Sequence, residues 1–215
     1  MFLFNQGSLE GTVTSWKKVF HSFLFLSFLT HCIHAQEWST EKDKNGVKVE
    51  TRYIDGWNIK EYRATVFIET SLEKAVHAYK DPVERKKFYE RAVLVSNLKE
   101  ISENEIITYL HGKAPWPVQD RDNVTHSTFS KPDPKTVRIT MHSVPDFIPV
   151  KKDIVRIPKS KGYWLFKDMG NGKIKVVQQS VADLGGSIPD WVVNSTIIEG
   201  PYDTLLALKN LLEGH

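Results

Sequence analysis

The last forty residues constrain the fold more than any other stretch of the chain. A strand-like run there ends at the pair Gly185-Gly186, which strand interiors disfavour, and Ser187 can cap a helix directly afterwards. Apolar residues then recur at helical spacing: Ile188, Trp191, Val192, Ile198, Leu205, Leu208 and Leu212. Pro201 is expected to kink this helix without ending it, because the apolar stripe resumes beyond it. A long C-terminal helix with one apolar face needs an apolar surface to lie on.

Most residues before this helix have the pattern of strands joined by tight turns. Alternation of apolar and polar residues predicts strands over residues 47–53, 58–68, 92–101, 105–111, 123–129, 136–144, 153–157, 163–167 and 173–180. Helices are expected over 71–80, capped by Ser71, and over 86–91 and 37–44. Turn signals such as Asp55-Gly56 favour hairpins, so the sheet should be antiparallel. The predicted fold class is α+β, with a curved antiparallel sheet wrapped around the C-terminal helix.

Length and composition describe an ordinary globular chain. Its 215 residues are enough for one good-sized domain, and 40% of them are hydrophobic and 26% charged. The formal charge is only +3, and no block of five Lys or Arg residues occurs. The chain therefore lacks the electrostatic signature of a nucleic-acid-binding protein.

Residues 1–35 have the layout of a secretory signal peptide. Lys17-Lys18 precede an apolar run over residues 19–29, and an A-x-A-like site ends at Ala35. The run is too short to span a bilayer stably, and a buried core helix is the alternative. We expect the protein to be secreted or periplasmic, with a mature domain over residues 36–215. Lipoprotein anchoring through Cys32 is disfavoured because a histidine precedes it. Cys32 is the only cysteine, so the mature chain has no disulfide or catalytic thiol.

Two motifs in the second half of the chain resemble a known family. The first is P-W-P-V followed by R-D, over residues 115–122, and the second is D-L-G-G-S-I-P-D-W-V-V-N, over residues 183–194. Their order and spacing resemble those of START (steroidogenic acute regulatory protein-related lipid transfer) domains over about residues 38–212. The resemblance implies a helix-grip fold that holds one lipid in a tunnel under the C-terminal helix. It also implies that this helix and an omega loop move to admit the ligand. Residues 145–150 would form that loop, with Phe147 and Ile148 as its bulky apolar residues.

The chain departs from the steroid-binding members at one cavity position. Those members carry an arginine six residues after the arginine of R-D, where this chain has Ser127. Sterol specificity is therefore not implied. Asn123, Thr125 and Ser127 share one face of the predicted strand, and Phe129 continues it. This wall would be uncharged and rich in hydroxyl groups, and would suit an amphipathic ligand with an uncharged polar end.

The candidate ligand-cavity and lid residues are Trp116, Asn123, Thr125, Ser127, Phe129, Phe147, Ile148, Trp191, Asn194 and Ile198. Trp116 could act as a rigid brace or lie at the cavity mouth, and Trp191 could be core or ligand contact. Asn194 shares a helix face with Trp191, and a buried amide there would need a polar partner. Arg121 and Asp122 are expected to form a structural pair or loop anchor.

The sequence supports neither a metal site nor a cofactor. His111, His126 and His142 lie on three predicted strands without the close spacing of metal ligands. Two hypotheses remain. The first is a monomeric binding module that carries a lipid or similar apolar molecule and touches membranes transiently, with Lys151-Lys152 either meeting anionic membrane or lying in a solvated hairpin. The second is an enzyme of the helix-grip superfamily acting on an apolar substrate in the same cavity. An enzyme would need a titratable group inside the tunnel, for which His126 and His142 are the candidates.

Overall fold

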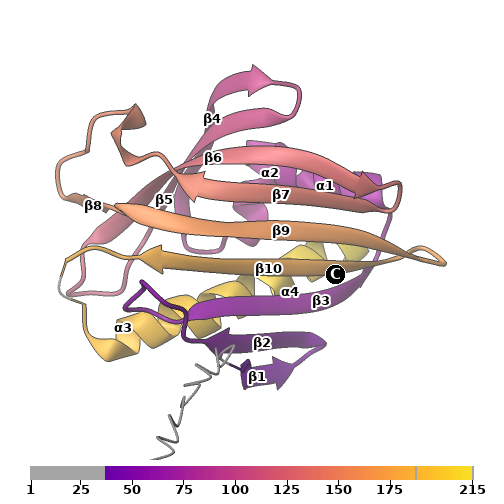
Figure 1. The fold of residues 1–215 in the computed structure, drawn as a ribbon, viewed down its shortest axis with the longest axis horizontal. Helices are drawn as coiled ribbons and strands as arrows, with labels where there is room; N and C mark the ends of the chain where they lie inside the picture. The colour runs from indigo at the N-terminus through magenta and orange to yellow at the C-terminus, as the bar shows by residue number, and fades with distance from the viewer. Residues whose placement is uncertain (1–36, 187, 215) are drawn as a thin grey trace, which may run out of the picture. The chain divides into compact units, whose positions relative to one another are not determined.

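The computed structural model describes residues 37–186 and 188–214, which form a single α+β unit (Figure 1). The predicted signal peptide over residues 1–35, including Cys32, lies outside the described residues. The described strands form one ten-stranded sheet in the order β1-β2-β3-β10-β9-β7-β6-β5-β4, with β8 paired to β6. Their bounds are β1 Ser39–Lys44, β2 Val47–Arg52, β3 Glu61–Glu69, β4 Ala92–Ser102, β5 Glu105–Gly112, β6 Asp120–Asp133, β7 Thr136–Ser143, β8 Ile154–Arg156, β9 Lys159–Gly170 and β10 Lys173–Asp183.

The strands follow from alternating burial and from turn chemistry. On β3, Ala64, Val66 and Ile68 are buried at period two, as expected for a strand with one face on the core. Gly170 and Gly172 both have positive φ in the turn between β9 and β10, which glycine adopts without steric cost. All pairings are antiparallel except that of β8 with β6, which is parallel. The predicted antiparallel sheet is confirmed apart from this short strand.

The two short helices begin at side-chain caps. In α1 (Leu72–Lys80), the Ser71 hydroxyl accepts from the backbone N–H of Lys74 at 3.2 Å, as predicted. In α2 (Pro82–Phe88), Asp81 is the cap and Pro82 occupies the first turn, so this helix starts four residues earlier than the predicted 86–91.

The predicted helix over residues 37–44 is wrong, because residues 39–44 form strand β1. Asn45 and Gly46, with φ of 52° and 76°, make the tight turn that pairs β1 with β2. Two consecutive residues with positive φ match the right-handed twist of a hairpin. The Asn-Gly dipeptide was the sequence signal for this hairpin.

The C-terminal helix comprises α3 (Asp190–Asn194), a π-helical turn η2 (Ser195–Glu199) and α4 (Gly200–Glu213). Pro201 lies in the first turn of α4 and has no N–H to donate to the preceding turn, which accounts for the irregular segment just before it. The helix continues past Pro201, as predicted.

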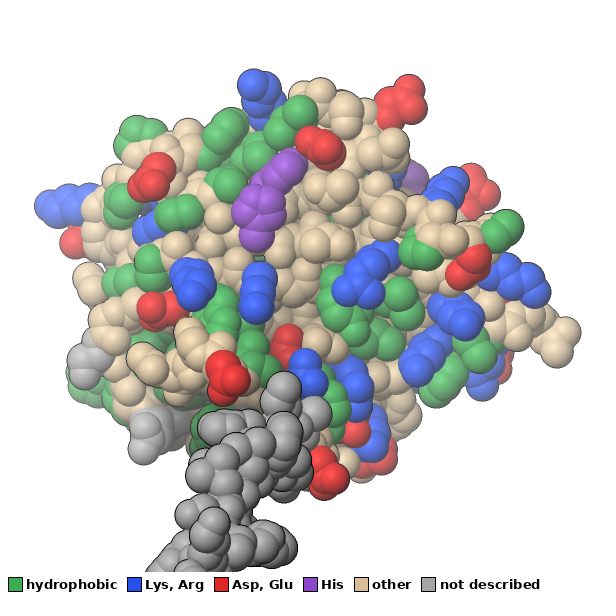
Figure 2. All heavy atoms as spheres, viewed as in Figure 1, with side chains coloured by type: hydrophobic (Ala, Val, Ile, Leu, Met, Phe, Trp, Pro, Cys, Tyr) green, Lys and Arg blue, Asp and Glu red, His purple; other side chains and the backbone are tan. Residues whose placement is uncertain are grey.

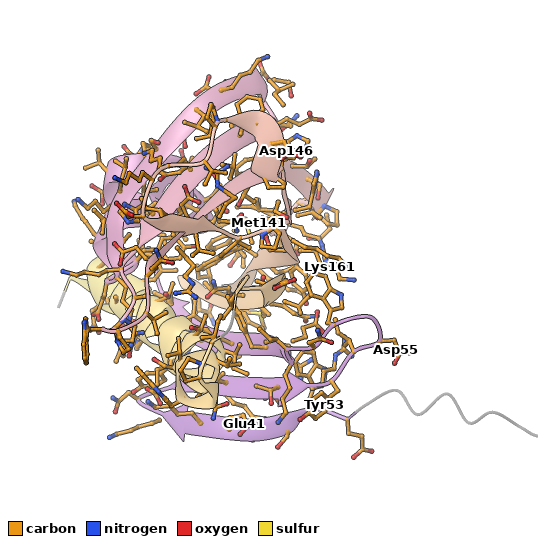
Figure 3. All side chains as sticks on the ribbon, turned by 90° about the vertical axis from the view of Figure 1, so that its left-hand side faces the viewer. Glu41, Tyr53, Asp55, Met141, Asp146 and Lys161 are labelled. Carbon is orange, nitrogen blue, oxygen red and sulfur yellow. The ribbon has the colours of Figure 1, made fainter. Side chains whose placement is uncertain are left out.

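The main core lies between α4 and the inner face of the sheet. From α4, it contains the buried Tyr202, Leu205, Leu208 and Leu212. From the sheet and α1, it includes Trp164, Phe166 and Tyr79, whose rings lie within 6.3 Å of one another. The sheet curves around the C-terminal helix, with side chains filling much of the space between them (Figure 3). No helix in residues 37–186 and 188–214 is both long and apolar enough to cross a membrane.

Candidate ligand-binding cavity

Two adjoining chambers remain open between the C-terminal helix and the sheet. The inner chamber, of about 220 Å³, lies among residues of β5, β6, β10 and α2. The outer chamber, of about 190 Å³, lies beside η2 and the start of α4. The two chambers share Tyr62, Tyr89, Leu110, Gln178 and Thr196. These shared walls make the chambers neighbouring parts of one hollow.

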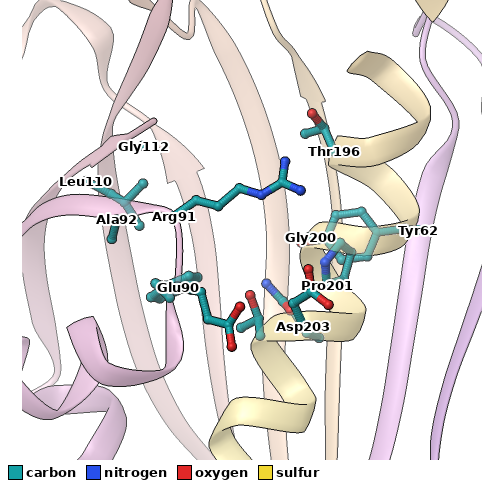
Figure 4. A pocket seen from close by; sticks show the side chains of 13 residues that line it. Tyr62, Glu90, Arg91, Ala92, Leu110, Gly112, Thr196, Gly200, Pro201 and Asp203 are labelled. Carbon is teal, nitrogen blue, oxygen red and sulfur yellow. The ribbon is translucent and has the colours of Figure 1, made fainter. Parts of the chain in front are cut away.

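A surface groove leads to the outer chamber. The groove, of about 680 Å³, shares Glu90, Arg91 and Ala92 with the outer chamber and is also lined by Trp116 and Trp191. Arg91 extends across the outer chamber toward the C-terminal helix (Figure 4). Its guanidinium donates to the Ser195 hydroxyl at 3.1 Å. A single hydrogen bond thus links the loop before β4 to the π-helical turn at the mouth of the cavity.

The inner chamber has a polar wall with neutral phenols. Burial raises the pKa of Tyr62, Tyr79 and Tyr89 above the ordinary value of 10.0, although the charge of Arg85 acts in the opposite direction on Tyr79 and Tyr89. All three phenols therefore stay protonated at physiological pH, and the Tyr79 hydroxyl donates to Met141 Sδ at 3.0 Å. The Gln178 Oε1 atom is also buried there without a partner among the described residues.

Arg85 places a positive charge in the same wall. Its side chain is only 3% exposed, and its Nη2 donates to Asn97 Oδ1 at 2.8 Å. Its guanidinium carbon lies 5.3 Å from the centre of the Tyr79 ring. In the part of the chain that the structure describes, no carboxylate lies within ion-pair distance of Arg85. A buried guanidinium whose charge is not neutralised is costly and so marks a candidate site.

The face predicted for β6 leads from the chamber into the core. Asn123 and Thr125 line the inner chamber. Ser127 is fully buried beside the Tyr79 hydroxyl, and Phe129 packs on the Tyr79 ring at 6.2 Å between ring centres. Neither Ser127 nor Phe129 lines either chamber, because β6 continues past the end of the hollow into the packed core.

The predicted lid residues lie at or near the surface. Trp116 is 91% exposed and Trp191 is 51% exposed in the groove. Asn194 is also exposed instead of buried, because α3 turns Val192 inward. Ile198 is half-buried and lines neither chamber.

The loop expected to act as a lid begins with a short 3-10 helix, η1 (Pro145–Phe147). Phe147 is partly exposed, whereas Ile148 packs on a small separate cluster of Ile107, Tyr109 and Val124. Neither loop residue lines the chambers.

The expected pair of Arg121 and Asp122 is not the pair that the structure contains. Asp122 instead binds Arg156, with Arg156 Nε 2.6 Å from Asp122 Oδ1 and Arg156 Nη2 3.0 Å from Asp122 Oδ2. Arg121 donates to the backbone carbonyl of Gln119. Consecutive residues of a strand point to opposite faces, so Arg121 and Asp122 cannot face each other.

The three histidines lie outside both chambers. His111 Nε2 lies 2.9 Å from Asp120 Oδ2, and His126 Nε2 lies 3.3 Å from Glu105 Oε2. The rings of His126 and His142 meet edge-on at 5.0 Å, and histidine side chains are visible on the outer face over β6 and β7 (Figure 2). Within the described part of the chain, no group of three or more His, Cys, Asp or Glu side chains could hold a metal ion.

Arg85 is the functional candidate that the sequence reasoning missed. It stands beside Lys86 and Lys87, and such a run of charges usually marks a solvated helix face. Its spacing was the available signal: Arg85 lies three residues before the buried Phe88 and three after Pro82, on the face of α2 that turns inward.

Comparison with known families identifies the fold and its relatives. The sequence profile of the START domain matches residues 27–205. The chain belongs to the START domain family. An uncharacterized protein of Pseudomonas aeruginosa is 32% identical to this START domain over 179 residues, covering 83% of this chain and 88% of that protein.

Solved structures of START proteins have the same fold. A fragment (residues 25–204) of a STAR-related lipid transfer protein from Xanthomonas axonopodis has a TM-score of 0.74 and 34% identity, covering 81% of this chain and 98% of that chain. Human StAR-related lipid transfer protein 5 has a TM-score of 0.74 at 18% identity, covering 82% of this chain and 86% of that chain. The expected helix-grip fold is confirmed, and lipid binding is supported in general terms.

An enzyme also shares the fold. The Zhui aromatase/cyclase from Streptomyces sp. R1128 has a TM-score of 0.51 at 12% identity, covering 72% of this chain and 91% of that one. At this identity the likeness concerns the fold alone.

Proposed function

We propose that this START domain holds one lipid or similar apolar molecule in the two chambers and carries it between membranes. The strongest support for ligand binding is that three hollows adjoin one another. The exposed groove meets the outer chamber, and the outer chamber meets the inner one. Binding would be driven by desolvation, since each buried CH₂ group contributes about 0.8 kcal/mol. Opening the entrance must cost less than the total gained.

Membrane contact would occur at the groove. Trp116 and Trp191 are large exposed aromatic side chains, and Arg91 and Lys113 line the same groove. Tryptophan is favoured at the interface between lipid and water, and basic side chains are attracted to anionic head groups. The entrance to the cavity would thus lie against the bilayer from which the lipid is taken.

We propose a carrier and not an enzyme. A catalyst of this fold would need a titratable group in the cavity, and the candidates His126 and His142 line neither chamber. The neutral hydroxyls of Tyr62 and Tyr89 in the inner chamber would serve as hydrogen-bond donors to a ligand.

The place of action would follow from the N-terminal segment. The basic pair, apolar run and A-x-A-like site of residues 1–35 support export, so we propose a secreted or periplasmic protein. We further propose that it works as a monomer without nucleic acid.

Transfer of a fluorescent lipid from donor to acceptor vesicles tests the proposal. The purified protein should accelerate transfer in proportion to its concentration. Thr125→Phe, which fills the inner chamber, should abolish the acceleration, whereas Thr140→Phe on an exposed position of β7 should not. Transfer no faster than in protein-free vesicles, or full transfer by Thr125→Phe, would contradict the proposal.

A further inference from the structure

We infer that the ligand is a single-chain amphiphile whose carboxylate end pairs with Arg85 in the inner chamber. This inference rests on the proposed function and specifies its ligand class. It replaces the uncharged polar end expected from the sequence, which considered only the β6 wall of Asn123, Thr125 and Ser127.

The charge of the inner chamber requires an anion. Among the described residues that line it, Arg85 and Lys161 are cationic and none is Asp or Glu. Lys161 is exposed and can be solvated, but Arg85 is buried and its contacts, Asn97 and Tyr79, are neutral. A buried charge is tolerated when it is paired, so a ligand anion would complete the site.

The donors present at this site suit a carboxylate. A guanidinium is planar and matches the two oxygens of a carboxylate with two parallel N–H groups. The protonated hydroxyl of Tyr89 belongs to the same wall and can donate to the same group, whereas the Tyr79 hydroxyl already donates to Met141 Sδ at 3.0 Å. A phosphate monoester would carry close to two negative charges at neutral pH, and only one buried cation faces it.

The acidic residues of the outer chamber favour this orientation. Glu90 and Asp203 line the outer chamber, whereas no Asp or Glu is among the described residues that line the inner chamber. An anionic end placed there would meet these two carboxylates as well as the guanidinium of Arg91, whereas at Arg85 it would meet a cation with no carboxylate in the described part of the chamber wall. The head of the ligand would thus lie in the inner chamber, with its chain extending toward the groove.

The size of the hollow limits the ligand to one chain. A cavity of about 150 Å³ holds one benzene ring. On this scale, chambers of about 220 Å³ and 190 Å³ have room for a chain of about a dozen carbons and not for two such chains. A diacyl lipid would require the C-terminal helix to move away from the sheet.

Binding of matched twelve-carbon probes to the delipidated protein tests the inference. By titration calorimetry, dodecanoate should bind about ten- to a hundred-fold more tightly than dodecanol, because a hydrogen-bonded charge pair is lost with the alcohol. Dodecyl phosphate should bind more weakly than dodecanoate. Dilauroyl phosphatidylcholine should not occupy the chambers.

Three variants test whether the preference for dodecanoate depends on the guanidinium of Arg85. Arg85→Gln should bind dodecanoate no better than dodecanol while its affinity for dodecanol stays near that of the wild type. Arg85→Lys should retain part of the preference. Arg138→Gln, on the outer face of β7 over the Tyr163 ring, is the matched control and should behave as the wild type.

The outcomes distinguish this inference from the proposed function. Equal affinity of the wild type for dodecanoate and dodecanol, or tightest binding of dodecyl phosphate or of the diacyl lipid, would overturn the inference and leave the carrier intact. Absence of binding to every probe would overturn both. The wild-type comparison remains decisive if Arg85→Gln fails to fold.

Discussion

Arg156 is the residue that ties the predicted lid loop to the sheet. Besides its pair with Asp122, it donates to the carbonyl of Ile148 at 3.1 Å and to that of Pro149 at 3.4 Å. Asp122 is fully buried and Arg156 nearly so. Arg156 therefore links the loop over residues 145–150 to Asp122 on β6, in addition to the packing of Ile148 on its small apolar cluster.

Replacing that carboxylate should destabilise the protein strongly. Asp122→Asn leaves the Arg156 charge buried without its counter-ion, which should lower the free energy of unfolding by about 3–5 kcal/mol in urea titrations. Asp146→Asn, on the exposed part of the same loop, is the control and should leave stability unchanged. Equal stability of Asp122→Asn and the wild type would show that this pair does not anchor the loop.

The face on which a side chain lies was predictable where the alternation of a strand decides it. Asn123 and Thr125 were expected on one face of a strand, and both line the inner chamber. The partner of Asp122 was not predictable, because Arg156 lies 34 residues away and meets it only through the parallel pairing of β8 with β6. The burial of Arg85 was not predictable either, because it depends on tertiary packing, whereas its sequence neighbours Lys86 and Lys87 suggest an exposed helix face.

At the scale of elements, a charged cluster joins β2 to β3. On β2, Glu50 Oε1 lies 2.8 Å from Lys48 Nζ, and Glu50 Oε2 lies 2.8 Å from Nη2 of Arg63 on β3. Burial acts to raise the pKa of Glu50, but the hydrogen bonds and positive charges of Lys48 and Arg63 together outweigh it, so the pKa lies below its ordinary value of 4.5. This lowered pKa makes the contribution of Glu50 to stability dependent on pH.

The sign of that dependence gives a second prediction. A carboxyl with a lowered folded-state pKa contributes fully above its unfolded value of about 4.5, and the contribution is lost as pH falls through the folded value. Glu50→Gln should therefore be less stable than the wild type by about 1 kcal/mol at pH 7, and the difference should shrink below pH 4.5. Urea titrations at several pH values measure it, with Glu100→Gln as control. A difference that grows on acidification would contradict this account.

The groove formed between α3 and the β5–β6 loop gives a third prediction. Trp116→Ala combined with Trp191→Ala should slow lipid transfer between vesicles by about five-fold or more, since each large aromatic contact is worth over 1 kcal/mol at an interface. Dodecanoate binding in solution should persist, because neither side chain lines the chambers. Phe67→Ala, an exposed aromatic on β3, is the control. Unchanged transfer by the double variant would place membrane contact elsewhere.

Elements with a clear period were predictable, and those fixed by long-range pairing were not. The strands from β2 to β10 and helix α1 were expected close to their observed positions. Strand β1 was mistaken for a helix because its residues are almost all polar and exposed, so no apolar period marks it. The parallel partner of β8 depends on a crossover that no local signal encodes.

At the scale of the whole molecule, the arrangement of sheet and helix was predictable, but its hollow was not. The same face of β6 contributes Thr125 to the chamber and Phe129 to the packed core, although both positions have the same strand parity. Whether a position lines a cavity depends on the volumes of side chains from several elements at once. The family resemblance implied a tunnel, whereas its size and its buried arginine came from the three-dimensional packing.

Native mass spectrometry of the gently purified protein tests the central claim most directly, namely that the space beneath the C-terminal helix holds one apolar ligand. We predict one bound small molecule per chain, released on denaturation and absent from Thr125→Phe. A mass equal to that of the bare chain, unchanged after incubation with dodecanoate and with lipid vesicles, would contradict the account.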